Sequence, residues 1–435
     1  MDVPTPDEMA AFHAMLGRLR ELPADHDVRL RAEHAAGSFA RDGRLRRRKA
    51  KEAMDSVADR GLLAATATGA AERAEDTALT TVDGTAGELR RSHRCYVCKG
   101  HYRHVHAFYH RLCPECAVDN ARRRDAGTDL SGRRVLLTGG RVKIGFRLAL
   151  MMLRDGAEVA VTTRFPHDAL RRFHAAGAPV ERLSVIGVDL RDPRQVLALC
   201  ERVAAAWGGL DALVNNAAQT IRRPAGAFAS LAARETGALP PGAWIAPGFA
   251  QGQAALPAAA SAAVLDESGL LPDLSPDNSW SAELGGLDPA ELLEVQLVNA
   301  VAPALLCDRL LPLLRSSKAK RRYIVNVTAV EGRFAVRRKT SRHPHTNMAK
   351  AALNMLTRTS AGELAGEGVY MCAVDTGWIT DENPAPKKAR LSAAGFRTPL
   401  DIVDGAARVY DPILRGEAGD PVWGVFLKDY REAEW

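Results

Sequence analysis

Residues 136–145 read LLTGGRVKIG, an apolar run followed by a glycine-rich turn. The run from 134 to 138 (RVLLT) is typical of a central parallel strand, and the residues after the turn predict a helix. A turn of this kind places backbone N–H groups at a helix N-terminus, where they can bind a pyrophosphate. Glycine is needed where a Cβ atom would block that approach, and Gly139, Gly140 and Gly145 meet the need. Alone, the turn is a weak signal, so other features must support it.

Downstream of the turn, short apolar runs alternate with helical patterns. Further strands are expected at residues 158–163, 183–190, 210–214, 323–327 and 369–374, with 422–426 as a candidate seventh strand. This alternation predicts an α/β fold with a Rossmann-type, doubly wound parallel sheet. A stretch rich in Ala, Gly and Pro interrupts the rhythm at about 222–287. We interpret it as an insertion on the ligand side of the sheet, since it follows the carboxyl end of a strand.

Four further motifs follow the turn. They are VDLRD from Val188, NNAA at 215–218, NVTAVEG at 326–332 and a helix that carries Lys350. Together with the turn they resemble the short-chain dehydrogenase/reductase family, in the family's own order. The resemblance covers residues 128–435 apart from the insertion. It implies a domain that binds a nicotinamide dinucleotide and transfers hydride to or from a carbonyl or alcohol.

By this resemblance, the cofactor would lie along the carboxyl edge of the sheet. Its diphosphate would rest on the glycine turn, its adenosine near the third and fourth strands, and its nicotinamide near the sixth. The residues implied in cofactor binding are Thr138, Gly139, Gly140, Arg141, Lys143, Ile144, Gly145, Arg164, Asp189, Leu190, Asn216, Ala217, Lys350 and Thr380.

Two cationic residues bear on the choice of cofactor. An NAD-preferring member of the family usually carries an acidic residue where this chain has Arg164. A guanidinium group there suits a 2′-phosphate, which favours NADP over NAD, although Arg164 could also be a plain surface residue. Lys143 stands where the family's turn has a glycine. Its side chain could crowd the cofactor or place an ammonium group on the phosphates.

The catalytic residues of the family are only partly present. In the family a Tyr is the acid/base, a Lys four residues later lowers its pKa, a Ser polarises the substrate oxygen and an Asn holds a relay water. Lys350 and Asn299 match the Lys and the Asn, but Thr346 replaces the Tyr and Ala329 replaces the Ser. A Thr hydroxyl has a pKa far too high to replace a phenol as an acid.

Three interpretations of this loss stay open. His343 or His345 could supply the proton because histidine titrates near neutrality, although each could equally be a polar loop or helix-cap residue. The pocket could bind a nucleotide without ordinary ketone reduction, or the domain could be a nucleotide sensor or scaffold. The basic segment 333–342 suggests an anionic substrate or partner, with a solvated loop as the alternative.

Two CxxC pairs lie upstream of the sheet, at residues 91–127. Each CxxC turn brings two thiolates to one side of a metal, and four thiolates complete a closed tetrahedron. The expected ligands are Cys95, Cys98, Cys113 and Cys116. The spacing predicts a small module folded around a structural zinc ion, with a redox disulfide as the weaker alternative. The module could dock a protein partner, whereas nucleic-acid binding is not expected.

Residues 1–90 predict a helical N-terminal region, beginning at the capping box formed by Thr5 and Glu8. Its basic cluster at 44–51 is either a solvated helix face or a phosphate-binding patch. The net charge of +7 on 435 residues is too mild to demand a polyanionic partner. The sequence shows neither a signal peptide nor an apolar run of membrane length, so we expect a cytoplasmic protein with no membrane contact.

These observations favour an NADP-dependent oxidoreductase with a nonstandard active site that acts on a small molecule, with an anionic substrate as the class that the basic segment 333–342 suggests. The alternative is a catalytically silent nucleotide-binding sensor or scaffold that docks a partner through the zinc module. The family often forms tetramers, so this domain could form a homo-oligomer unless the N-terminal units block the contact.

Overall fold

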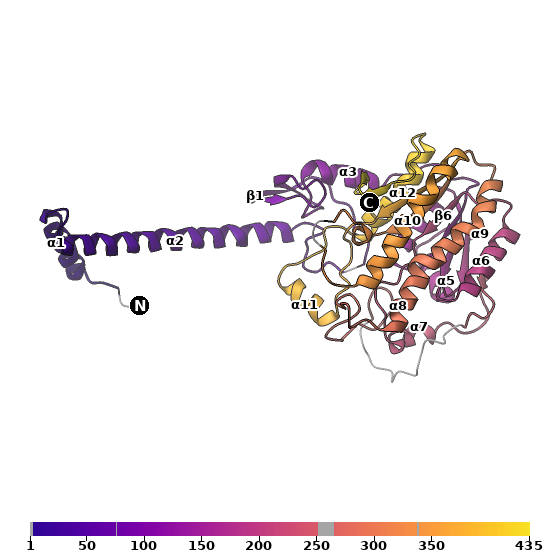
Figure 1. The fold of residues 1–435 in the computed structure, drawn as a ribbon, viewed down its shortest axis with the longest axis horizontal. Helices are drawn as coiled ribbons and strands as arrows, with labels where there is room; N and C mark the ends of the chain where they lie inside the picture. Colours follow the sequence, from indigo (N-terminus) through magenta and orange to yellow (C-terminus); the bar gives the residue numbers. More distant parts are fainter. Residues whose placement is uncertain (1–2, 75, 251–264, 337–338) are drawn as a thin grey trace.

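The computed structural model describes residues 3–74, 76–250, 265–336 and 339–435. The chain forms an α/β body, a small cysteine module beside it, and a helical arm that projects away from both (Figure 1). Part of the predicted insertion, and two residues of the basic segment 333–342, lie outside the described residues.

The body is built on a sheet of nine strands. They are β3 (Arg134–Leu137), β4 (Glu158–Thr163), β5 (Leu183–Gly187), β6 (Ala212–Asn215), β7 (Ala243–Ile245), β8 (Arg322–Thr328), β9 (Val369–Asp375), β10 (Phe426–Lys428) and β11 (Arg431–Ala433). Their order is β11-β10-β9-β8-β6-β3-β4-β5-β7, and every neighbouring pair is parallel except β10 and β11. The order reverses beside β3, which confirms the predicted doubly wound fold.

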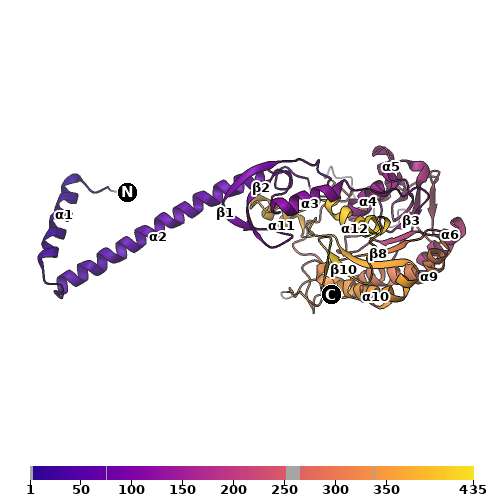
Figure 2. The ribbon, with the colours of Figure 1, turned by 90° about the horizontal axis from the view of Figure 1, so that it is seen from above.

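Helices cover both faces of this sheet (Figure 2). On one face lie α4 (Lys143–Arg154), α5 (Pro166–Ala175) and α12 (Ile402–Glu417), and on the other lie α6 (Pro193–Ala206), α9 (Ala302–Ser316) and α10 (Pro344–Gly366). Each layer encloses its own apolar core with residues such as Leu137 and Leu213, because a parallel strand buries both of its faces.

One helical stretch, Pro289–Ser316, is long and apolar enough by length and composition to cross a membrane. It consists of α8 (Pro289–Gln296), a π-helical turn η3 (Leu297–Val301) and α9. Buried residues such as Leu306 and Leu310 pack it onto the sheet, so in this structure it is a core helix.

Two strands differ from the sequence-based expectation. The last parallel strand begins at Phe426 and not at Val422, because Gly424 adopts φ +67° and breaks the extended run. The insertion contributes β7, which pairs with β5 and extends the sheet by one strand. The rest of its described part includes η2 (Ala225–Phe228) and α7 (Ala229–Ala232).

The arm consists of α1 (Pro6–Glu21) and α2 (Asp27–Ala64), so its helices end at Ala64, whereas the sequence predicted a helical region up to residue 90. The predicted capping box at Thr5 and Glu8 is present. Figures 1 and 2 show α2 as a long rod that leaves the body, with α1 folded back at its far end. Asp59 is the buried residue of α2, and its carboxylate accepts the N–H groups of Arg90 and Arg91.

The cysteine module comprises β1 (Thr85–Arg94), β2 (His101–His106) and α3 (Pro114–Arg124). It begins earlier than the predicted boundary at 91, because β1 starts at Thr85. Residues 66–68 also pack on the module, where the N–H groups of Ala67 and Thr68 donate to the carbonyls of Ala107 and Phe108. Sequence alone hides this pairing, since the partners lie about 40 residues away.

Candidate functional site

The glycine turn between β3 and α4 is packed tightly against the loop after β6. Gly139 has φ +71°, and a Cβ atom on it would lie 2.9 Å from the Cα of Ala217. A Cβ atom on Gly145 would lie 2.1 Å from the carbonyl oxygen of Gly139. The Asn216 side chain donates to the carbonyls of Thr138 and Gly139 at 3.0 and 3.1 Å. The predicted residues of the two motifs are therefore brought together, and no larger residue fits the glycine positions.

Lys143 occupies the turn with a left-handed backbone, at φ +53°. Its ammonium nitrogen lies 2.9 Å from Asp76 Oδ2 and 3.5 Å from Glu382 Oε1. Burial alone would lower the pKa of Lys143, but the attraction of Glu382 and Asp76 outweighs it and raises that pKa. The ammonium group thus faces two carboxylates, one from the segment after α2 and one from the loop after β9.

The other cationic and apolar residues assigned to the turn have different partners. Arg141 is buried and donates to Asp168 at 2.7 Å and to the carbonyl of Ser268 in the insertion. Ile144 packs against both the body core and the core of the cysteine module. The hydroxyl of Thr380 donates to the same Glu382 that faces Lys143, at 3.1 Å.

The predicted adenosine side lies at the ends of β4 and β5. The Arg164 guanidinium lies over the ring of Phe228, 4.9 Å from its centroid, and burial lowers the pKa of Arg164. Asp189 pairs with Arg191 at 2.6 Å, and Leu190 is buried beside it. A hollow of about 730 Å³ opens here, lined by Asp189, Arg191, Asp192, Arg194, Gln195 and Glu294. The hollow is shallow and open to solvent, so it marks an accessible surface next to Asp189.

Lys350 lies on α10 facing the end of β8. The side chain is buried, and its ammonium donates to the carbonyl of Val327 at 2.9 Å. Burial lowers the pKa of Lys350 to about 8, although the charge of Glu331 opposes that shift. A lysine with such a pKa can hold or release a proton near neutral pH.

The three candidate groups before Lys350 lie at the start of α10. The ring of His343 stacks on Trp280 from the insertion, with centroids 4.0 Å apart and planes 9° apart. His345 is 1% exposed, and its Nε2 lies 3.9 Å from Glu291 of α8. Burial lowers the pKa of both histidines. Thr346 is also buried, and its hydroxyl has no hydrogen-bond partner within the described residues.

Asn299 lies in the π-helical turn η3. Its side-chain oxygen accepts the N–H of Gln219 at 2.7 Å, and its amide nitrogen donates to the carbonyl of Gln219 at 2.9 Å. The amide therefore fixes the loop that continues from the NNAA motif. Both described hydrogen bonds of the Asn299 side chain go to the backbone of Gln219 in this loop.

The four cysteines of the module converge on one point. Their sulfur atoms all lie within 4.8 Å of one another, and those of Cys98 and Cys113 are 3.7 Å apart. Tetrahedral zinc with Zn–S bonds of about 2.3 Å requires sulfurs about 3.8 Å apart, so the geometry fits a zinc ion. The N–H of Cys113 donates to the sulfur of Cys95 at 3.3 Å, which is the kind of contact that stabilises a thiolate.

Comparisons with known proteins agree with this architecture. The family model of short chain dehydrogenase matches residues 133–236, and that of enoyl-(acyl carrier protein) reductase matches residues 276–398. An uncharacterized protein of Acanthamoeba polyphaga mimivirus is 33% identical over 352 residues, which span 74% of this chain and 71% of that protein. The chain belongs to the short-chain dehydrogenase/reductase family.

Solved structures of short-chain dehydrogenase/reductases are similar in fold. The Pseudomonas aeruginosa RhlG/NADP active-site complex is 22% identical with a TM-score of 0.46, over 69% of this chain and 95% of that one. The NADPH-bound carbonyl reductase from chicken fatty liver is 18% identical with a TM-score of 0.46, over 70% of this chain and 100% of that one. At these identities the likeness concerns the fold alone.

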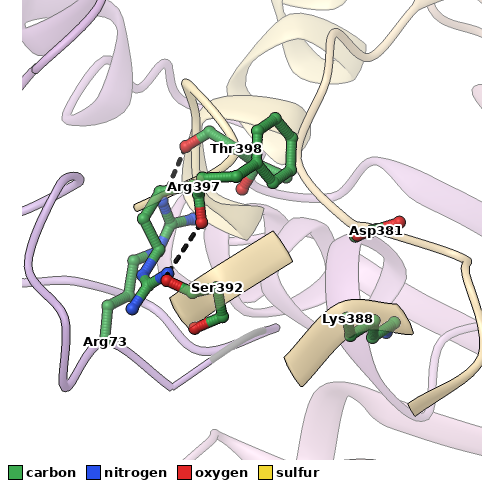
Figure 3. A pocket seen from close by; sticks show the side chains of 7 residues that line it. Arg73, Asp381, Lys388, Ser392, Arg397 and Thr398 are labelled. Atoms are coloured by element: carbon green, nitrogen blue, oxygen red, sulfur yellow. Dashed lines mark hydrogen bonds between the residues drawn. The ribbon is translucent and has the colours of Figure 1, made fainter. Parts of the chain in front are cut away.

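Residues N-terminal to the cysteine module hold the segment after the loop that follows β9. Arg73 donates to the carbonyl of Thr398 at 2.8 Å (Figure 3) and to that of Leu400 at 2.6 Å. Arg397 donates to the carbonyls of Ala70 and Ala71. The cavity between them measures about 20 Å³, which is room for about one water molecule. It is therefore a joint between chain segments and not a substrate pocket.

Sequence reasoning missed two carboxyl groups of the dehydrogenase/reductase site. Asp375 ends β9, and its carboxylate accepts the N–H groups of Val330 at 2.6 Å and Gly377 at 3.0 Å. Glu331 lies in η4 (Val330–Gly332), directly after β8. The signal for both was their place at the carboxyl ends of neighbouring parallel strands, where side chains of a site gather.

Proposed function

We propose that this chain is an NADP-dependent oxidoreductase that transfers hydride to or from a carbonyl or alcohol on a small molecule. The observation that carries the proposal is the buried Lys350, which the fold holds at the end of β8. Burial lowers the pKa of its ammonium group to about 8, close to neutral pH. Burying an ammonium group costs free energy, so its retention points to a function for it.

The chain's own residues fit the cofactor in most respects. The turn at Gly139 and Gly145 leaves bare backbone at the N-terminus of α4, which suits a diphosphate. When bound, the nicotinamide would supply or accept the hydride. Arg164 is the residue we assign to the 2′-phosphate, while Lys350 would orient the ribose. NADP-bound relatives such as the RhlG complex support this choice.

A titration of tryptophan fluorescence with NADPH, NADH and ATP tests the proposal. We expect NADPH to bind more tightly than NADH by at least tenfold, since a charge-assisted pair with the 2′-phosphate contributes about 1.5–3 kcal/mol. Arg164→Glu should abolish that preference, whereas the matched surface variant Arg309→Glu should keep it. Equal affinity of the unaltered chain for NADPH and NADH would remove the role of Arg164.

A second candidate function is a catalytically silent nucleotide sensor that docks a partner through the cysteine module. The replacement of the family's Tyr and Ser by Thr346 and Ala329 favours it, because neither side chain can donate a proton near neutral pH. Saturable NADPH binding together with no NADPH oxidation across a panel of aldehydes, ketones and quinones would select this alternative.

We also propose that the cysteine module holds a structural zinc ion and that the protein works in the cytoplasm, where thiols stay reduced. The substrate would be small, and anionic if basic residues of the segment 333–342 line its entrance. We propose a homo-oligomer of the α/β body, because members of the family often form oligomers; light scattering on the purified chain would test it. Cell fractionation would test the proposed cytoplasmic location.

A further inference from the structure

The active site lacks an acid where the family places one. Thr346 and Ala329 stand at the family's Tyr and Ser positions, and neither can donate a proton near neutral pH. The buried hydroxyl of Thr346 has no partner among the described residues, so a polar atom of a ligand would satisfy it. If the chain reduces a carbonyl, another group must provide the proton.

Glu331 is the carboxyl-bearing residue that the fold fixes next to Lys350. Gly332 packs so closely on α10 that an added Cβ atom would lie 2.8 Å from both the C and Cβ atoms of Lys350. The carbonyl of Gly332 accepts the side-chain amide of Asn354 at 3.1 Å. On the other side, the N–H of Val330 donates to Asp375 at 2.6 Å. The backbone of Glu331 is therefore held from both sides.

The charges around Glu331 come from four elements. The charges of Asp375 from β9, Lys428 from β10 and Lys339 from the following loop act on Glu331. The charge of Glu331 in turn acts on Lys350 of α10. Burial raises the pKa of Glu331, and Asp375 adds to the rise, while the two lysines Lys428 and Lys339 oppose it. Because the pKa of Lys350 is lowered to about 8 and that of Glu331 is raised, the difference between the two pKa values is smaller than in water. Such a pair can hold a proton that is ready for transfer.

We propose that the carboxyl group of Glu331, in the turn that packs on Lys350, is the acid/base group of this chain. This inference rests on the proposed oxidoreductase function. In the reduction, the carbonyl carbon receives hydride from a reduced nicotinamide, and the C=O π electrons move to the oxygen. The carboxyl O–H bond of Glu331 breaks, and its proton forms the new alcohol O–H bond. The resulting carboxylate is stabilised by the charges of Lys428 and Lys339 and regains a proton from water.

The histidines are poorer candidates for this step. His343 is stacked flat on Trp280, and the ring of His345 faces Glu291 on the α8 side of α10. Burial lowers the pKa of both rings, so they are neutral where a proton donor is needed. The η4 turn, in contrast, packs on the face of α10 that carries Lys350.

The first test is an infrared titration of the full-length chain that follows the C=O stretching band of protonated carboxyl groups. We expect the difference between the unaltered chain and Glu331→Gln to contain a band that persists above the pH at which ordinary carboxyl groups ionise. The exposed Glu363→Gln on α10 is the matched control for the substitution itself. Absence of such a band from the Glu331→Gln difference would overturn the inference, whether or not a substrate is known.

The second test follows NADPH oxidation with a panel of aldehydes, ketones and quinones. We expect Glu331→Gln to lower kcat at least 100-fold with unchanged NADPH affinity, and Glu331→Asp to restore part of it. The rate of the unaltered chain should fall as pH rises through the pKa of Glu331, and the Gln variant should lack that limb. An unchanged kcat and pH profile in Glu331→Gln would overturn this inference alone. Absence of NADPH binding in the unaltered chain would overturn the proposed function.

Discussion

Arg124 of the cysteine module forms a buried, two-pronged ion pair with Asp401 of the α/β body. Its Nη2 lies 3.1 Å from Asp401 Oδ2 and its Nη1 3.2 Å from Asp404 Oδ1, with the arginine side chain 2% exposed. Asp401 is also the N-cap of α12, where it accepts the N–H groups of Val403 and Asp404. The module is thus anchored on the helix that covers the glycine turn, and the two parts share one core at Leu400.

Replacing this arginine should destabilise the whole chain. Arg124→Met would leave Asp401 and Asp404 buried without their cation, which costs about 3–5 kcal/mol. We expect a single lowered urea midpoint for both the module and the body, followed by tryptophan fluorescence. Arg122→Met, on the exposed side of the same helix, should change stability by less than about 0.5 kcal/mol. Equal effects of the two variants would contradict the anchoring role.

The pairing of Lys143 predicts a gain in cofactor binding when one carboxylate is removed. Asp76→Asn takes one negative charge from the glycine turn while the ammonium stays paired with Glu382. We expect NADPH to bind roughly fivefold more tightly, a gain on the order of 1 kcal/mol that shrinks at high salt. The exposed Asp83→Asn serves as the control. Unchanged or weaker NADPH binding in Asp76→Asn would show that this ion pair does not oppose the diphosphate.

The sequence predicted the strands of the body well and the partners of its site poorly. Buried parallel strands such as β4 and β8 are continuous apolar runs, and their signal is local. The three residues of β7 lie in an Ala/Gly/Pro-rich stretch and become a strand only because β5 offers a free edge. The partners of Lys143 lie 67 and 239 residues away in sequence, at Asp76 and Glu382, so no local pattern could reveal them. Likewise, the raised pKa of Glu331 depends on a burial that only the folded chain creates.

The cysteine cluster predicts about one zinc ion per purified chain. Cys98→Ser should remove the metal and lower the Tm, because structural zinc contributes directly to the folding free energy of a small module. The core variant Cys200→Ser should keep the metal, since Cys200 lies on α6 in the core of the body. Metal analysis and thermal unfolding in the presence of a chelator provide the measurement. A chain that carries well under one equivalent of zinc and ignores the chelator would contradict the assignment.

The lowered pKa of Lys350 predicts an unusual dependence of stability on pH. In the folded chain its pKa is about 8, against an ordinary value of 10.5, so between these values the unfolded chain binds more protons. Stability contributed by this group therefore rises with pH across that window and is lowest below pH 8. Lys350→Met removes the cost, so we expect the variant to be more stable than the unaltered chain by about 1–3 kcal/mol at pH 7. Urea unfolding at pH 7 and pH 10 should show that gap closing at the higher pH, because the folded lysine is then neutral. The exposed Lys318→Met should show no such pH-dependent difference. If the stability gap of Lys350→Met were the same at pH 7 and pH 10, burial of the charged ammonium group would not destabilise the folded chain.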